Sequence, residues 1–331
     1  MNLDIKSIQI KPKRNTFGHI ERRIGADKMA TRYEEATYDI QPTTNFHYLP
    51  LYNSKYEIYD ERKTAIKMGD WYKFLDPRQY YYGSYVNTRA KQQETTDQNF
   101  SFIEKRNLLS TMSADIKNQI LTSLLPIRHF EWGANMNNLQ LVSECYGAAF
   151  GSAAMFYAED RLGNAQLITR IGLALSENDP SVIDEAKEIW LKDASWQPLR
   201  KAMEDSFIVE DWFELFVAQN VVMDSFIHSL FFDAYEQELR NKGENVQSMM
   251  TEFLTNWHEE TIKWIDKTVQ VGASESDENK QLITTWVKKY IDIAQDAVLP
   301  LAKNLVSDPN ETVANIKQNL IDRLNKNSLS L

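Results

Sequence analysis

The chain has 331 residues, 43% of them apolar, which is enough to bury a sizeable core in one large domain or two smaller ones. Its formal net charge of −10 argues against nucleic acid or an anionic membrane as a partner, because both require a basic face. The 11 glycines favour helices over a sandwich or barrel with many tight turns. One cysteine excludes an intrachain disulfide, and with no apolar signal at the N-terminus it predicts a cytoplasmic protein.

Residues 1–95 are rich in tyrosine and proline and show little helical periodicity. So many aromatic rings argue against disorder, yet the segment is poorly patterned for a core of its own. We therefore expect an extended N-terminal arm that packs its rings on the helical body or on another subunit. Large aromatic side chains give much contact area, and adjacent arginines suit an acidic surface. The predicted partner interface consists of Arg22, Arg23, Tyr33, Tyr38, Tyr80, Tyr81 and Tyr82.

Residues 96–331 read as a single all-α domain of long helices. Apolar residues from Leu108 to Leu124 recur at helical spacing, and a second helix is expected over 128–159, followed by a further piece over 162–175. Small residues such as Gly147 would let neighbouring helices approach the helix over 128–159 closely, so we expect that helix to be the central one of the bundle. The later helices follow proline and capping signals, and they are expected from Pro180, from Pro198, over 209–242, over 245–271, over 278–305 and from Pro309 to about Lys326.

The histidines of the chain do not fit the metal site that such helices commonly build. A four-helix bundle that holds two irons needs a Glu-x-x-His step on each of two helices, because side chains at i and i+3 project from one face. None of the five histidines has a carboxylate three positions before it; they are His19, His47, His129, His228 and His258. We therefore expect the architecture of a metalloenzyme without its metal site, in a protein that serves an enzyme.

Asp224 and His228 form the best local constellation, an i,i+4 pair within an apolar helix. They would suit a metal, but we favour a buried histidine hydrogen-bonded to the carboxylate one turn away, because buried polar groups need partners. Glu131, Glu144 and Glu214 also fall within expected helices, and there we favour paired charges over metal ligands.

Other candidate residues are weaker. His258 follows Thr255, which stands where a ligand glutamate would be, and its neighbours Glu259 and Glu260 do not face one another on a helix. We expect Cys145 to be a buried core residue, because a catalytic thiol needs an electropositive, partly exposed setting. The sequence contains no phosphate-binding glycine loop, dinucleotide fingerprint, paired-cysteine zinc spacing or nucleophile elbow.

Two stretches of the arm carry specific motifs. The first, over 22–48, contains RRIG, ATRYEEATYDI and NFHY, and the second is DPRQYYYGSYV over 76–86, followed by Arg89 and Gln92. These stretches resemble the small oxygenase subunit of phenol hydroxylases, which is the β subunit of the bacterial multicomponent monooxygenases. That family includes toluene and methane monooxygenases.

The resemblance implies an all-α, ferritin-like helical bundle without metal ligands, preceded by an extended N-terminal arm. In this family the α subunit carries the di-iron site, and the β subunit has a similar fold without the ligands. Residues 158–166 are similar to the first Glu-x-x-His region of α, with Arg161 and Asn164 in place of Glu and His. Thr255 and His258 would mark the second region. An arginine in place of a ligand removes the negative charge that two irons need.

The resemblance also implies a noncatalytic structural subunit of an NADH-dependent phenol hydroxylase, which converts phenol or a methylphenol to a catechol. Its partners would be α and γ subunits in a dimer of αβγ trimers, a regulatory protein, and a reductase with FAD and a 2Fe–2S cluster. No cofactor is expected on this chain. The alternatives are a helical adaptor unrelated to oxygenases and an autonomous metalloenzyme with an atypical site made of Asp224, His228, Glu144 and Glu214.

Overall fold

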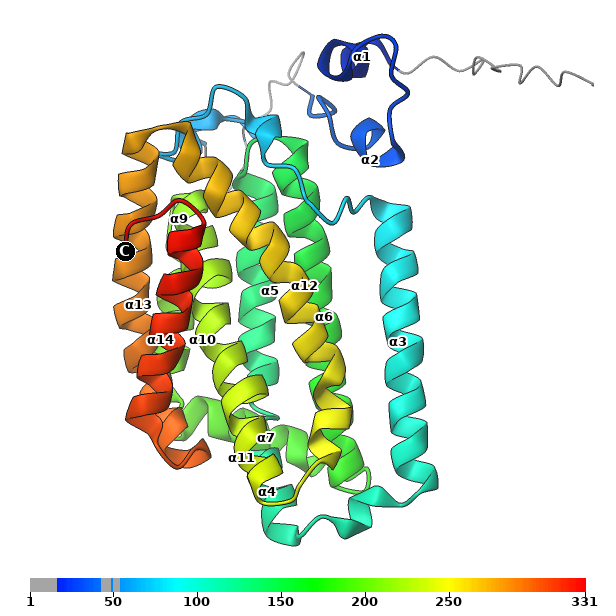
Figure 1. The fold of residues 1–331 in the computed structure, drawn as a ribbon. Coiled ribbons are helices and arrows are strands. Elements are labelled where there is room, and N and C mark those ends of the chain that lie inside the picture. The colour runs from blue at the N-terminus through cyan, green and yellow to red at the C-terminus, as the bar shows by residue number, and fades with distance from the viewer. Residues whose placement is uncertain (1–16, 43–48, 50–53) are drawn as a thin grey trace, which may run out of the picture.

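The computed structural model describes residues 17–42, 49 and 54–331, and the regular structure of these residues is entirely helical. Four long helices pack side by side as a bundle (Figure 1). They are α5 (Ile127–Glu144), α6 (Ala148–Leu175), the continuous helix Trp212–Asn241 and α12 (Val246–Glu275). The prediction of an all-α bundle is therefore confirmed.

Further helices cover this bundle. On one side α3 stands beside α6 and α12, on the other α13 and α14 pack on the helix Trp212–Asn241, and α4 and α7 lie at the lower end in Figure 1. The bounds are α1 (Gly18–Ile24), α2 (Arg32–Glu35), α3 (Tyr82–Lys105), α4 (Ala114–Ser123), α7 (Ser181–Lys192), α8 (Gln197–Ser206), α13 (Asp277–Leu305) and α14 (Pro309–Lys326). The short turns are η1 (Glu61–Lys63), η2 (Trp71–Lys73) and η3 (Leu108–Thr111).

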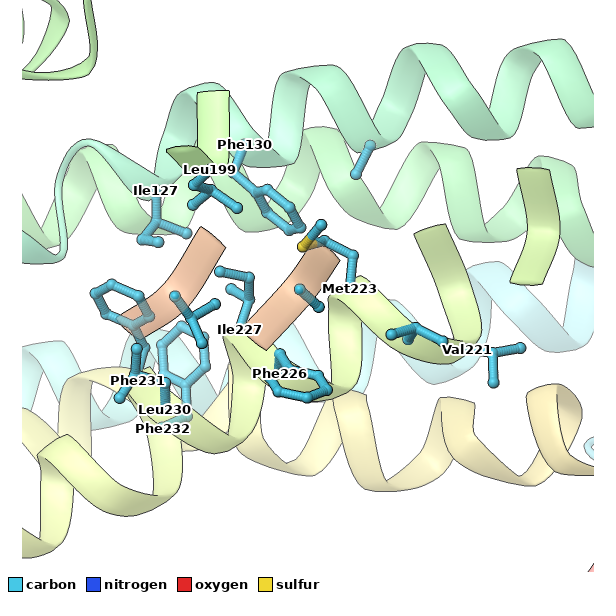
Figure 2. Close-up of a cluster of buried hydrophobic side chains, with 14 of the residues drawn as sticks. Ile127, Phe130, Leu199, Val221, Met223, Phe226, Ile227, Leu230, Phe231 and Phe232 are labelled. Carbon is cyan, nitrogen blue, oxygen red and sulfur yellow. The ribbon is translucent and has the colours of Figure 1, made fainter. Parts of the chain in front are cut away.

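The helix Trp212–Asn241 forms the core of the molecule. Its apolar side chains, such as Phe226 and Leu230, are buried because other helices surround it (Figure 2). Among the described residues it is the one helix long and apolar enough to span a membrane, but 94% of its apolar window is buried inside the protein, as in a core helix. Its successive parts are α9 (Trp212–Phe216), η4 (Val217–Met223), α10 (Asp224–His228), η5 (Ser229–Ala234) and α11 (Tyr235–Asn241), of which η4 and η5 are π-helical.

The helix expected over 128–159 is broken after Glu144, which the sequence analysis did not foresee. Gly147 has a positive φ of +90°, and its amide donates a hydrogen bond to Gln41 Oε1 at 2.6 Å. A Cβ at this glycine would lie 3.2 Å from the Cβ of Trp71, so the N-terminal region packs directly against the break. Beyond it α6 runs without interruption to Leu175, so the two pieces expected on either side of residue 160 are one helix.

Two other boundaries differ from expectation. Helix α3 begins at Tyr82, so the segment expected to be extended up to residue 95 is helical in its last part. The division of the chain into an arm and a helical domain otherwise stays a prediction. The helix expected from Leu108 starts only after Ser113, whose hydroxyl accepts a hydrogen bond from the amide of Ile116. The motif residues 45–48, which include His47, lie outside the described residues.

Candidate functional site

A fully buried guanidinium lies where the four bundle helices meet. Arg161 of α6 donates through Nη1 to both carboxylate oxygens of Glu131 on α5, at 3.0 and 3.1 Å. Its Nη2 donates to Asp224 Oδ2 in α10 and, at 2.8 Å, to the hydroxyl of Tyr157. The fourth helix, α12, contributes Trp257, whose ring centroid lies 4.9 Å from the guanidinium carbon.

Neighbouring side chains satisfy the remaining acceptors of the two carboxylates. The Tyr157 hydroxyl donates to Asp224 Oδ2 at 2.6 Å, and Gln219 Nε2 donates to Asp224 Oδ1 at 2.9 Å. Asn164 Nδ2 donates to Glu131 Oε2 at 3.2 Å. A buried charge persists only when it is paired and hydrogen-bonded in this way. The Arg161 cluster consists of Arg161, Glu131, Asp224, Tyr157, Asn164 and Gln219.

The electrostatics of the Arg161 cluster follow from its burial. Burial raises the pKa of both Glu131 and Asp224 by disfavouring the carboxylate, and the charge of Arg161 opposes this rise. For Arg161 itself, burial acts to lower the pKa, but Asp224 and Glu131 raise it above its ordinary value. The guanidinium therefore stays charged and is the cation of this interior.

The residues of the Arg161 cluster do not fit a di-iron centre. Arg161 and Asn164 stand where the resemblance expects a glutamate and a histidine, and a guanidinium has only donors to offer. Its hydrogen bonds already bridge the two carboxylates, Glu131 and Asp224. Within the described part of the chain, no group of three or more His, Cys, Asp or Glu is placed to hold a metal ion.

Next to the Arg161 cluster lie two stacked histidines. The rings of His228 and His258 are 4.1 Å apart between centroids and nearly parallel, at 3°. Burial lowers the pKa of both imidazoles well below the ordinary value, which leaves both rings neutral. Neither ring nitrogen of His228 has a hydrogen-bond partner among the described residues. The prediction of a hydrogen bond between Asp224 and His228 is therefore wrong, because Asp224 accepts hydrogen bonds from Arg161, Tyr157 and Gln219 instead.

The other carboxylates considered as ligands are paired charges, as favoured from the sequence. Glu144 forms a 2.9 Å ion pair with the buried Lys63, and Glu214 accepts from Lys289 Nζ at 2.7 Å. Neither carboxylate joins Asp224 in a group that could hold a metal ion among the described residues. Cys145 is buried, and burial raises its pKa to about 12, as expected for a core thiol.

A second buried network attaches α3 to the bundle. Asp160 of α6 accepts from Arg89 Nε and Nη2 at 2.8 and 2.7 Å, from the Tyr85 hydroxyl at 2.8 Å and from Trp257 Nε1 at 2.8 Å. Arg89 also donates to Glu260 of α12. Trp257 thus contacts both networks, because its ring also covers the guanidinium of Arg161.

Several residues predicted to form a partner interface are occupied within this chain. Tyr33 is buried and its hydroxyl accepts from the amide of Asp76 at 2.7 Å. Tyr80 is also buried and donates to Glu260 Oε1 at 2.6 Å, while Tyr81 is half-buried at the start of α3. Tyr80 therefore ties the N-terminal region to α12 of the bundle, whereas the bond of Tyr33 lies within the N-terminal region itself.

Arg23 is likewise engaged inside the chain. It donates to Asp39 at 2.6 Å and to Asp70 at 2.7 Å, and its guanidinium lies 5.1 Å from the ring centroid of the half-buried Tyr38. Arg23 is nevertheless exposed, as are two further predicted interface residues, Arg22 and the 74% exposed Tyr82. A contact of these residues with a partner stays a prediction.

Two neighbouring bundle helices, α5 and α6, expose apolar side chains that were not predicted from the sequence. In α5 every exposed residue is apolar, namely the 57% exposed Trp132 with Met136 and Leu139, and α6 adds Met155 and Leu162. We call these five residues the α5–α6 face. The only signal in the sequence is that apolar residues recur all round α5, which is typical of a helix covered on every side. Exposed apolar patches of this kind mark interaction sites.

A family model described as methane/phenol/alkene hydroxylase matches residues 49–276. The oxygenase component DmpL of phenol 2-monooxygenase from Pseudomonas sp. strain CF600 is 43% identical over 92% of this chain and 91% of its own length. The corresponding component MhpL from Acinetobacter pittii is 39% identical over 98% of this chain and 97% of its own.

A solved structure agrees with these relatives. The crystal structure of phenol hydroxylase from Pseudomonas sp. OX1 contains a chain with a TM-score of 0.93 and 39% identity, and the match covers 99% of both chains. The predicted ferritin-like helical fold is confirmed by this likeness, and so is the resemblance that the arm motifs carry. The chain belongs to the methane/phenol/alkene hydroxylase family and is a subunit of a multicomponent monooxygenase.

Proposed function

We propose that this chain is the noncatalytic structural β subunit of a cytoplasmic phenol hydroxylase. The whole enzyme uses O2 to convert phenol or a methylphenol to a catechol. NADH supplies the electrons through a reductase that carries FAD and a 2Fe–2S cluster. The di-iron centre belongs to the α subunit, and the assembly is a dimer of αβγ trimers that also binds a regulatory protein.

The observation that carries this proposal is the guanidinium of Arg161. It lies between carboxylates of two bundle helices, where it supplies the positive charge that two buried carboxylates require. The charges inside the bundle are thereby neutralised by its own side chains. A chain built this way contributes shape and contact area to an oxygenase, and the chemistry belongs to a chain with a different interior.

The α5–α6 face supports the same role, because a supporting subunit needs a surface for its partner. On α5 this face carries no exposed charge, and on α6 the exposed Glu159 lies between Met155 and Leu162. Such a mainly apolar face on two long helices suits a rigid contact with helices of another subunit, with aromatic and methionine side chains as its anchors. We assign this face to the α subunit. The N-terminal arm, with Arg22 and Tyr82 exposed, extends the contact.

Coexpression with the partner subunits tests the proposal. The purified complex is expected to contain iron and to hydroxylate phenol, whereas the isolated full chain binds no stoichiometric iron and has no activity. As a control, Asp224→Ala with His228→Ala in this chain should reduce stability or assembly and leave the iron content per assembled complex unchanged. Stoichiometric iron in the isolated chain would favour the autonomous metalloenzyme instead.

A further inference from the structure

A cleft of about 750 Å³ lies between α8 and α13, with the first turns of the core helix as its floor. Its volume is typical of small-molecule sites, which span roughly 300–1,000 Å³. The buried side chains of Met203, Ala218 and Met223 line the floor, and Ile208, which is 81% exposed, stands at the rim with Ile293. The cleft therefore offers apolar surface to a ligand, and the supporting role proposed above does not use it.

The charges around the cleft select against anions. Five carboxylates line it against two ammonium groups; these residues are Asp205, Glu210, Asp211, Glu214 and Asp296, with Lys201 and Lys289. Both lysines already pair with carboxylates of the same cleft, Lys201 with Asp205 and Lys289 with Glu214. The excess of negative charge repels a carboxylate or phosphate ligand and leaves a neutral molecule unaffected.

Glu214 supplies a hydrogen-bond acceptor at the edge of the apolar floor. Its Oε1 accepts from the Tyr290 hydroxyl at 2.8 Å and from Lys289 Nζ at 2.7 Å. No described residue donates a hydrogen bond to its Oε2. Glu214 lies one helical turn before Ala218, so the acceptor and the apolar floor face the same side of the helix. The bond from Tyr290 demonstrates that this carboxylate accepts a phenolic hydroxyl.

The remaining polar groups of the floor are already satisfied. Gln219 donates to Asp224 and accepts from Asn137 Nδ2 at 2.8 Å, and the Ser206 hydroxyl donates to the carbonyl of Met203. The floor therefore offers little further polar recognition. A ligand that fits has an apolar ring and one hydrogen-bond donor.

We propose that this α8–α13 cleft binds a neutral phenol, whose ring packs on Met203, Ala218 and Met223 and whose hydroxyl donates to Glu214. The inference rests on residues of this chain alone. It goes beyond the proposed supporting role, because that role does not require a phenol site on this subunit. A binding measurement, which needs no turnover, tests it.

Binding to the purified full chain is measured by equilibrium dialysis and by saturation-transfer NMR, with phenol and with benzoate as probes. Phenol should bind saturably at one site. Benzoate has the same ring and a negative charge, so its affinity should be at least about tenfold lower in the acidic cleft. Equal affinity for the two probes, or no saturable phenol binding, overturns the proposal.

Two substitutions locate the site within the cleft. Glu214→Ala should weaken phenol binding about tenfold or more, because it removes a hydrogen bond to a charged acceptor. Glu210→Ala removes a second carboxylate of the same cleft, one that is exposed, and serves as the matched control with a change of about twofold or less. Ala218→Phe should fill the floor and abolish binding. If this variant does not fold, Glu214→Ala alone decides, and unchanged binding there rejects the site.

Discussion

The guanidinium of Arg161 is held by side chains from helices that are far apart in the sequence. Glu131 precedes it by 30 residues and Asp224 follows it by 63. Each carboxylate is fully buried, so each depends on this cation for its compensation. The stability of the bundle interior therefore depends on the charge of Arg161.

Replacing Arg161 by Met should destabilise the chain by about 3–5 kcal/mol, because two buried carboxylates lose their counter-charge. Urea unfolding followed by circular dichroism measures the change. Adding Glu131→Gln and Asp224→Asn to this variant should restore part of the stability. Arg170→Met is the control: its pair with Asp97 is exposed, so the loss there should stay below about 1 kcal/mol. Similar losses for both arginines would contradict the assignment.

At the scale of elements, the break between α5 and α6 sets the geometry of the bundle. It lets the two helices fold back on each other, which brings Glu131 of α5 beside Arg161 of α6. Gly147 makes the break possible through its positive φ, and the close approach of Trp71 leaves little space for a side chain.

Gly147→Ala should therefore destabilise the chain by about 1–3 kcal/mol, the usual cost of holding a residue with a Cβ in a sparsely populated backbone conformation. Gly163→Ala within α6 is the matched control, because a Cβ there meets no atom within 4 Å. Alanine in a helix should leave the stability unchanged or raise it by about 0.5–1 kcal/mol. Urea midpoints compare the two variants, and equal midpoints would argue against a special role for the break.

At the scale of the whole molecule, a fully packed helical core is combined with exposed apolar side chains on the α5–α6 face. The core helix is covered on all sides, whereas Trp132, Met136 and Leu139 expose apolar surface on α5. Such a surface costs solubility in an isolated chain and is stabilising once a partner covers it. We therefore expect the α5–α6 face to be covered by a partner in the assembled protein.

If the α5–α6 face binds the proposed α subunit, Trp132→Glu with Met136→Glu should abolish coelution of this chain with that subunit in size-exclusion chromatography. Two charges would be desolvated in the contact without partners. The unfolding midpoint of the isolated chain should hardly change, because both side chains are exposed. Lys303→Glu on α13 changes the net charge by the same amount away from the α5–α6 face and should leave assembly intact. Coelution of the double variant would exclude this face.

Much of the fold could be predicted because it depends on local patterns. Prolines and the apolar period placed the helices after residue 175 to within a few residues, as in α14 from Pro309 to Lys326. The break at Gly147 could not, because its cause is contact with Gln41 and Trp71, more than 70 residues away in the chain. A glycine among other small residues looks the same in a close helix contact and in a turn.

The sequence by itself determined the helical class, the absence of any Glu-x-x-His step and the family resemblance, because each of these depends on residue identity and spacing. Only the tertiary structure decided the partners of each charge. It paired Arg161 with Glu131 and Asp224, stacked His228 on His258, and turned Tyr33 and Tyr80 inward. The physical reason is that burial and pairing are properties of helices brought together in space, which a pattern along one chain does not record.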